Sequence, residues 1–355
     1  MFRGERRRRG MLGLSLKDGA KKARYLANFA RRRLVHTNMQ LLYDCNFHCR
    51  ICDFWREKGR NPPRLSAAQV RVLSDRMAEI GPQVVSIGGG EPLLHPELVE
   101  VVEALARHHF PVMICNGWFV EEPIARALWR AGIYEVSVSV DYADPARHDA
   151  QRGMPGAFER ALRALEILAR TRVAPHQRVH MISVVMDDNV DDLEALVLRC
   201  RELGITYLVT LYSDKRGALP VRRVPNDVGA RLLELKRRHP EFVSLRGYVG
   251  RFSEAIRAGG LGPCRAGRNL CNIDSQGDVS LCIDRLQEPV GNIFRDEPRL
   301  LERRLRARHD GNTCRACWTS CRGSIETLLY GERPLANLWD YHQMTRDAAL
   351  AERRV

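Results

Sequence analysis

The chain has 355 residues, of which 45% are hydrophobic and 7% aromatic, which is the composition of a folded globular protein with room for one large and one small domain. No run of about 18 apolar residues occurs, which excludes a membrane-spanning helix. The arginine-rich start lacks the apolar stretch of a signal peptide, so we expect a cytoplasmic protein.

The net charge of +14 is concentrated at one end of the chain. Residues 1–33 hold twelve Lys or Arg against two acidic residues, a balance of +10, which leaves +4 for the remainder. This distribution predicts a basic N-terminal arm rather than a nucleic-acid-binding face spread over the body.

An amphipathic helix is predicted at 14–34, with one apolar stripe formed by Leu26, Phe29, Ala30 and Leu34. Two interpretations are open. The stripe packs on the outside of the fold and leaves a solvated basic face, or the arm contacts anionic lipid or an acidic peptide.

From residue 35 onward, short apolar runs rich in β-branched residues alternate with helical stretches, which predicts βα units around a parallel sheet. The six expected strands are 35–43, 84–90, 111–117, 134–141, 179–186 and 205–213. The six expected helices are 66–80, 97–109, 122–131, 157–171, 190–203 and 226–238. Ser66 with Gln69 has the spacing of a capping box, and Pro123 suits a first helical position.

Eleven cysteines in a reducing compartment favour metal ligation over disulfides. Three of them, Cys45, Cys49 and Cys52, have the spacing Cys-x3-Cys-x2-Cys. Three thiolates leave one coordination position of a metal site open, and an open position is reactive. The alternative is a closed zinc site that takes His48 as its fourth ligand.

Two motifs follow the first two strands. The cysteine loop begins directly after the first strand, and Gly88-Gly89-Gly90-Glu91-Pro92 ends the second. In this order, within six βα units, they resemble the radical S-adenosylmethionine (SAM) superfamily over about residues 35–215. The resemblance implies an α/β fold, a partial (β/α)6 TIM-like barrel with its chemistry at the C-terminal ends of the strands.

The resemblance also implies cofactors. Cys45, Cys49 and Cys52 would hold a [4Fe–4S] cluster whose fourth iron binds SAM, and reductive cleavage would give a 5′-deoxyadenosyl radical that abstracts a hydrogen atom from the substrate. The implied SAM-binding residues are Gly89, Gly90, Glu91, Asn116, Ser139, Asp141 and Arg152. Among them, Glu91 would accept from the SAM ammonium group, Ser139 and Asp141 would approach the ribose, and Arg152 would pair with the SAM carboxylate. The sequence departs from the family at Ile51, where an aromatic residue is usual.

Cys115 stands where the family usually has Thr, directly before Asn116. Its thiol is a candidate catalytic group that returns a hydrogen atom to a substrate radical. The alternative is a small residue in place of Thr.

A second group of six cysteines lies at Cys264, Cys271, Cys282, Cys314, Cys317 and Cys321. This region resembles the SPASM and twitch auxiliary-cluster domains, with a hairpin turn expected at Gly277. Six cysteines cannot complete two four-cysteine clusters, so we expect one auxiliary [4Fe–4S] cluster. We expect Cys264, Cys282, Cys314 and Cys317 to be its ligands, with Cys271 and Cys321 as replacements. Two incomplete clusters and a zinc ribbon are the alternatives.

The predicted organisation is a basic arm at 1–34, a radical SAM barrel at 35–239, a linker at 240–263, an auxiliary-cluster domain at 264–322 and a helical tail at 323–355. The predicted activity is radical chemistry on a peptide, a small metabolite or a lipid precursor, with electrons from a flavodoxin or ferredoxin. An RNA-modifying radical SAM enzyme and a non-enzymatic iron–sulfur carrier are the alternatives, although no RNA-binding module and hence no nucleic-acid partner is expected.

Overall fold

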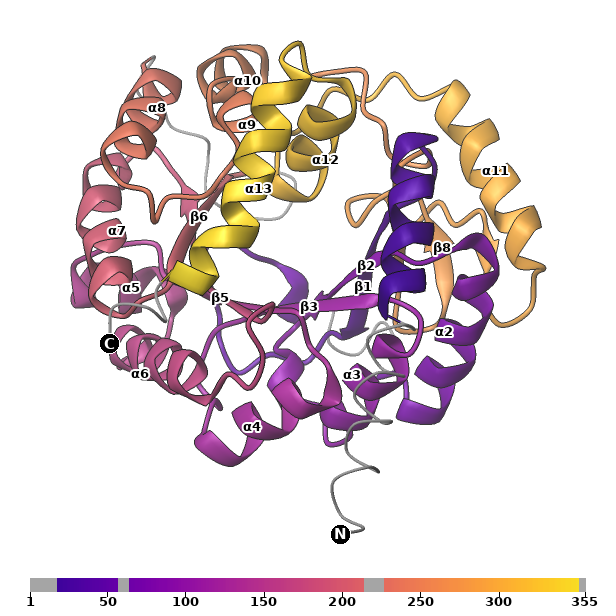
Figure 1. Cartoon of the computed structure of the whole chain (residues 1–355), viewed down its shortest axis with the longest axis horizontal. Coiled ribbons are helices and arrows are strands. Elements are labelled where there is room, and N and C mark those ends of the chain that lie inside the picture. The colour runs from indigo at the N-terminus through magenta and orange to yellow at the C-terminus, as the bar shows by residue number, and fades with distance from the viewer. Residues whose placement is uncertain (1–17, 57–63, 214–226, 351–355) are drawn as a thin grey trace, which may run out of the picture.

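The computed structural model describes residues 18–56, 64–213 and 227–350, and a nine-stranded sheet organises this part of the chain (Figure 1). The strand order is β6-β5-β4-β3-β2-β1-β7-β8-β9, and the strands from β6 to β7 are parallel. The strands are β1 (His36–Leu42), β2 (Val84–Gly89), β3 (Phe110–Cys115), β4 (Glu135–Ser139), β5 (Arg178–Val185), β6 (Thr206–Leu211), β7 (Leu270–Ile273), β8 (Asp278–Ser280) and β9 (Gly291–Asn292). The expected α/β partial barrel is confirmed.

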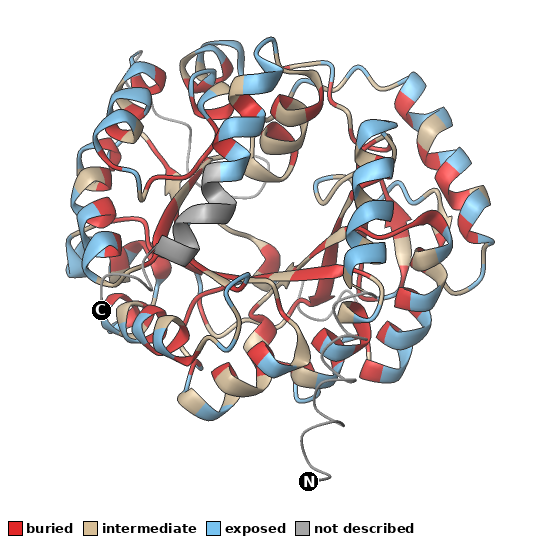
Figure 2. Cartoon of the chain, viewed as in Figure 1, coloured by how far each residue is buried: buried red, intermediate tan, exposed pale blue. Residues whose placement is uncertain are grey.

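Helices cover the outer surface of the curved sheet, and Figure 2 shows the buried residues on the strands and on the helix sides that face them. The helices of the barrel are α2 (Ala67–Ile80), α3 (Leu98–Ala106), α4 (Glu122–Ala131), α5 (Pro145–Arg152), α6 (Ala157–Thr171), α7 (Leu193–Glu202) and α8 (Val228–Arg238). Short 3₁₀ turns lie at η1 (Phe54–Arg56), η2 (Pro92–Leu94) and η3 (Val190–Asp192). The capping box of Ser66 and Gln69 opens α2, and Pro123 lies in the first turn of α4, both as expected.

Alternate residues of each strand face two different environments. Met113 and Val136 lie beside each other on neighbouring strands and belong to the large core between sheet and helices. Ile114, next to Met113, is 41% exposed although it lies in a central strand of the sheet. Because side chains alternate between faces along a strand, Ile114 belongs to the inner face of the barrel, which is accessible to solvent.

The C-terminal cysteine region is joined to the barrel through the sheet. β7 pairs with β1 in parallel, with Thr37 opposite Cys271, and an antiparallel pair of β7 and β8 forms the expected hairpin around Gly277. Gly277 has φ +83°, a conformation that favours glycine. The remaining helices of this region are α11 (Pro298–Asp310), α12 (Ser320–Tyr330) and α13 (Pro334–Leu350).

Residues 240–263, expected to be a linker, are instead packed structure. They contain α9 (Arg246–Val249) and α10 (Phe252–Ala258), and they bury Phe242, Tyr248 and Phe252 in the main core. The apolar residues of this segment are irregularly spaced, which hides short helices from a periodicity argument.

The N-terminal helix runs over residues 18–30, and residues 14–17 of the expected helix lie outside the described residues. Its orientation differs from the expected one. Lys21, Tyr25 and Asn28 face the protein, whereas Leu26, expected in the packed stripe, is 61% exposed.

Candidate active site

The loop after β1 carries Cys45, Cys49 and Cys52 at the C-terminal ends of the strands. Phe47 anchors the loop, because its ring is buried in a small apolar cluster with Tyr142. The backbone N–H of Phe47 donates to Cys45 Sγ at 3.4 Å. The sequence thus provides a loop that presents three thiols while one aromatic side chain fixes its position.

The glycine turn after β2 holds the cysteine loop by its backbone. Gly90 N donates to Leu42 O and Glu91 N donates to Asp44 O, both at 2.8 Å. A Cβ atom at Gly89 would overlap the Leu42 carbonyl, and one at Gly90 would overlap the Asp44 carbonyl. Gly89 also has φ +112°. Only glycine therefore permits this close approach of the two strand ends.

Glu91 is almost fully buried beside the loop. Its Oε2 accepts from Asn116 N at 2.8 Å and its Oε1 accepts from Leu93 N at 3.1 Å. Burial raises the pKa of Glu91 to about 7, although these two hydrogen bonds oppose the shift. Each carboxylate oxygen keeps a second lone pair, so Glu91 can still accept from a ligand such as an ammonium group.

Asn116 ties the end of β3 to the cysteine loop. Its Nδ2 donates to Asn46 Oδ1 at 2.8 Å, and its Oδ1 accepts from Trp118 N at 2.9 Å. Asn116, which the resemblance assigns to SAM binding, positions the loop through Asn46. Asn46 was not singled out in the sequence, where its place between Cys45 and Phe47 was the available signal.

Asp141 and Arg152 form a buried ion pair against the loop. Arg152 Nη2 lies 2.6 Å from Asp141 Oδ2, and Arg152 Nη1 lies 4.0 Å from Cys49 Sγ. Asp141 Oδ1 accepts from Val184 N at 2.8 Å, which fixes the carboxylate on the barrel. The expected roles were a ribose contact for Asp141 and a carboxylate partner for Arg152, but the structure pairs the two residues with each other and directs the guanidinium at a cysteine.

The segment around Arg152 also contacts the cysteine loop, which the sequence did not reveal. Gln151 O accepts from Arg50 N at 3.0 Å, and Gly153, with φ +63°, packs against the His48 carbonyl so closely that a Cβ atom would lie 2.8 Å from it. The end of α5 therefore holds the second half of the cysteine loop, and the glycine turn holds its start. His48 lies with its ring against Trp55 at 4.8 Å between centroids.

Cys115 does not lie on the open face of the barrel. Its side chain is buried in the main core, and burial raises the pKa of its thiol well above the usual value. Ile114 occupies the exposed inner face next to it. This placement disagrees with a hydrogen-atom donor that reaches the substrate and supports the alternative of a small residue in place of Thr. Ser139, at the end of β4 beside Ile182, is partly exposed.

The three loop thiols share one electrostatic environment. Burial raises the pKa of Cys45 to about 12, and Glu91, Cys49 and Cys52 add to the shift. Burial also raises the pKa of Cys49, against the lowering effect of Arg152. The raised pKa values of Cys45 and Cys49 favour the protonated thiols, and an iron–sulfur cluster would replace those protons.

This donor set fits a cluster better than a closed metal site. Three soft sulfur donors on one partly buried loop suit iron–sulfur ligation. Within the described ranges, no three His, Cys, Asp or Glu side chains already converge as ligands of a single metal ion.

In the second region, contacts link some of the cysteines. Arg322 Nη1 lies 4.0 Å from Cys317 Sγ, and burial, with a smaller contribution from Cys317, raises the pKa of Cys264. Cys264 N also donates to Cys314 O at 3.0 Å. Cys321 lies in the first turn of α12, with its thiol 3.2 Å from Thr319 Oγ1.

Cys271 and Cys282 are placed differently. Cys271 lies on β7 with its buried thiol 3.4 Å from Thr37 Oγ1, and burial raises the pKa of that thiol to about 11. Cys282 follows β8 and packs at the edge of the main core.

Comparison with known proteins agrees with this geometry. The sequence profile of the Radical SAM superfamily matches residues 39–200, and mycofactocin maturase MftC of Mycobacterium ulcerans is 31% identical over 317 residues that cover 80% of each chain. The chain belongs to the radical SAM superfamily. This radical SAM protein is therefore an enzyme that uses a [4Fe–4S] cluster and SAM.

Other relatives differ in how much of the enzyme they match. The AdoMet-dependent heme synthase of Methanosarcina barkeri is 30% identical over 166 residues, 46% of each chain. The PqqA peptide cyclase of Gluconobacter oxydans is 24% identical over 343 residues, 87% of this chain and 92% of the relative. Among solved structures, Streptococcus suis SuiB bound to its precursor peptide SuiA superposes with a TM-score of 0.61 at 15% identity, over 77% of this chain and 66% of SuiB, which supports the fold.

Proposed function

We propose that this radical SAM enzyme modifies a peptide, from which it removes a hydrogen atom after reductive cleavage of SAM. The span of similarity carries this proposal. Eighty per cent of the chain matches a maturase and 87% matches a peptide cyclase, and matches of that length necessarily extend beyond the barrel. The match to the heme synthase covers 46% of the chain.

The residues of the site would have different roles. Cys45, Cys49 and Cys52 would hold the cluster that supplies the electron for cleavage of a carbon–sulfur bond of SAM. Glu91, ionised, would accept from the SAM ammonium group. Arg152 would place a fixed positive charge beside Cys49, and Asp141 would hold that guanidinium in position.

We further propose that the second cysteine region holds one auxiliary [4Fe–4S] cluster. Cys264, Cys314 and Cys317 would supply three ligands, which is supported by the backbone hydrogen bond from Cys264 to Cys314 and by the contact of Cys317 with Arg322, and Cys282 or Cys321 would supply the fourth. Arg322, buried between Cys264 and Cys317, would balance the negative charge of the thiolates. A flavodoxin or ferredoxin would deliver the electrons.

The test measures 5′-deoxyadenosine formed by anaerobically reconstituted protein reduced with dithionite. We expect formation by the native chain and none by the Cys45→Ala/Cys49→Ala/Cys52→Ala variant, because a cluster without its thiolates cannot bind. Cys200→Ala is the matched control, since Cys200 is a buried core cysteine of α7. Undiminished cleavage in the triple variant would contradict the assignment.

The substrate class needs a separate measurement. Candidate peptides, RNA oligonucleotides and small carbonyl or tetrapyrrole compounds are added in turn, and the products are analysed by mass spectrometry. We expect a peptide to increase 5′-deoxyadenosine formation and to transfer deuterium into it when labelled at the reacting carbon. Turnover of RNA or of a small molecule alone would overturn the peptide assignment and leave the radical SAM chemistry intact.

A further inference from the structure

The helix at 18–30 is bound to the barrel by a side that combines the polar Lys21 and Asn28 with the ring of Tyr25. Lys21 Nζ donates to Ala106 O at 3.0 Å and to His109 O at 3.3 Å, and it lies 4.9 Å from the centroid of the Phe110 ring. Burial lowers the pKa of this lysine. Because the lysine occupies the inner side, Leu26 points outward and is 61% exposed.

α13 also places polar side chains toward the protein and apolar side chains toward the outside. Asn337 and Asp340 face the protein, where Asn337 Nδ2 donates to Thr327 O at 2.9 Å and Asp340 pairs with Arg246 at 3.2 Å. The outward residues are apolar: Leu335 is 81% exposed, Leu338 48% and Trp339 52%. Their spacing of three and four residues places them on one stripe of the helix.

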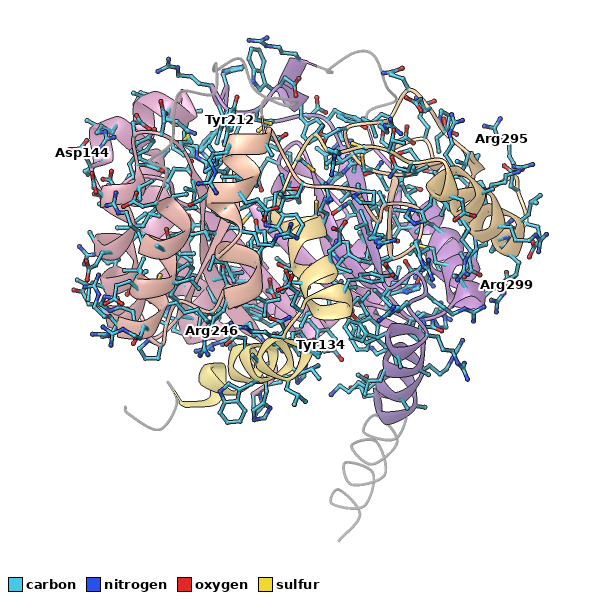
Figure 3. All side chains as sticks on the ribbon, turned by 90° about the horizontal axis from the view of Figure 1, so that it is seen from above. Tyr134, Asp144, Tyr212, Arg246, Arg295 and Arg299 are labelled. Atoms are coloured by element: carbon cyan, nitrogen blue, oxygen red, sulfur yellow. The ribbon has the colours of Figure 1, made fainter. Side chains whose placement is uncertain are left out.

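Both helices lie on one side of the molecule, which we call the basal face and define by Lys22, Leu26, Leu335, Leu338 and Trp339. In Figure 3 both helices project from the side on which Tyr134 and Arg246 lie, opposite Tyr212 and Asp144. Tyr212 and Asp144 follow the C-terminal ends of β6 and β4, so the basal face lies away from the cysteine loop.

The charge around the apolar stripes is basic. Lys22 and Arg31 are exposed on the N-terminal helix or at its end, and residues 18–33 carry a balance of +5. An apolar stripe with a tryptophan, flanked by cations, matches the boundary between headgroups and acyl chains of an anionic bilayer. A second copy of the chain would bring two such positive charges together, which opposes self-association through this face.

We propose that the basal face docks on an anionic membrane surface. Leu26, Leu335, Leu338 and Trp339 enter the interface, while Lys22 and Arg31 attract the lipid headgroups. The cysteine loop, at the other end of the barrel, then faces the aqueous side, where SAM and a peptide can reach it.

The experiment compares sedimentation of the full, reconstituted chain with vesicles of phosphatidylcholine and with vesicles that also contain about one quarter phosphatidylglycerol. The Leu26→Asp/Leu335→Asp variant is expected to bind the anionic vesicles at least about tenfold more weakly, because each leucine loses its transfer into the apolar layer. Val72→Asp is the matched control, since Val72 is 49% exposed on the outer side of α2. SAM cleavage should be unchanged in both variants, which verifies their folding.

A second readout identifies the contact itself. Brominated acyl chains should quench the tryptophan fluorescence of the native chain, and the quenched fraction should fall in the Trp339→Phe variant. Equal binding of the double variant and of native protein would overturn the proposal and assign any vesicle binding to the basic arm alone. Failure to bind anionic vesicles, or a dimer that Leu335→Asp dissociates, would also overturn it.

Discussion

Glu91 shows how one buried side chain couples the site to pH. Its folded pKa is raised by burial to about 7, above the ordinary value of 4.5, so the folded chain binds a proton that the unfolded chain has released. The stability contributed by this proton is complete below the unfolded pKa and is lost as the pH rises through the folded value.

We therefore expect metal-free native protein to lose about 2 kcal/mol of unfolding free energy between about pH 5.5 and about pH 8 relative to Glu91→Gln, which cannot titrate. Urea unfolding at several pH values measures the difference. Glu103→Gln, at an exposed glutamate of α3, is the control and should follow the native chain. Parallel pH dependences of native protein and Glu91→Gln would contradict a raised pKa.

At the scale of elements, the periodicity of the sequence predicted the six parallel strands and the helices between them. Those elements are long, and each begins or ends at a recognisable signal, such as the capping box of Ser66. α5 was not predicted, because it has eight residues, is mostly polar, and is stabilised locally by the cap of Asp144. The orientation of the N-terminal helix could not be predicted either, since the acceptors of Lys21 come from α3 and the turn after it, about 85 residues away.

In the candidate site, too, the sequence predicted some features and not others. The motifs identified the cysteine loop and the glycine turn, because their roles depend on local backbone. The placement of Cys115 depends on the strand face that it occupies, and the pairing of Asp141 with Arg152 depends on how α5 packs against the end of β4; packing in the folded barrel decides both.

Strand geometry also separates the six C-terminal cysteines. Cys271 lies opposite Thr37 in the β1–β7 pair, and its buried thiol contacts the Thr37 hydroxyl. In the Cys45→Ala/Cys49→Ala/Cys52→Ala background, we expect Cys271→Ser to retain about four irons per chain and Cys317→Ser to lose them, if one cubane is present. Iron analysis after anaerobic reconstitution measures this. Equal loss in both variants would return Cys271 to the ligand set.

At the scale of the whole molecule, the sheet makes the barrel and the cysteine region interdependent. β7 covers the edge of β1 with four register pairs from His36 to Met39, and Asn269 adds bonds to Val35 and His36 through its carbonyl. An uncovered edge strand exposes backbone donors and acceptors that pair with other chains. The region after residue 263 therefore completes the barrel as well as supplying ligands.

A chain that ends at Pro263 should accordingly aggregate, because β1 would keep a bare edge beside the buried side chains of Met39 and Leu41. A chain that ends at Gly331 keeps β7 and loses only α13 and the residues after it, so it should remain soluble and monomeric and should still cleave SAM. Soluble yield and size-exclusion chromatography compare the two truncations. A soluble, monomeric chain ending at Pro263 that cleaves SAM as fast as the full chain would show that the barrel folds independently, and that the pairing of β7 with β1 adds little to its stability.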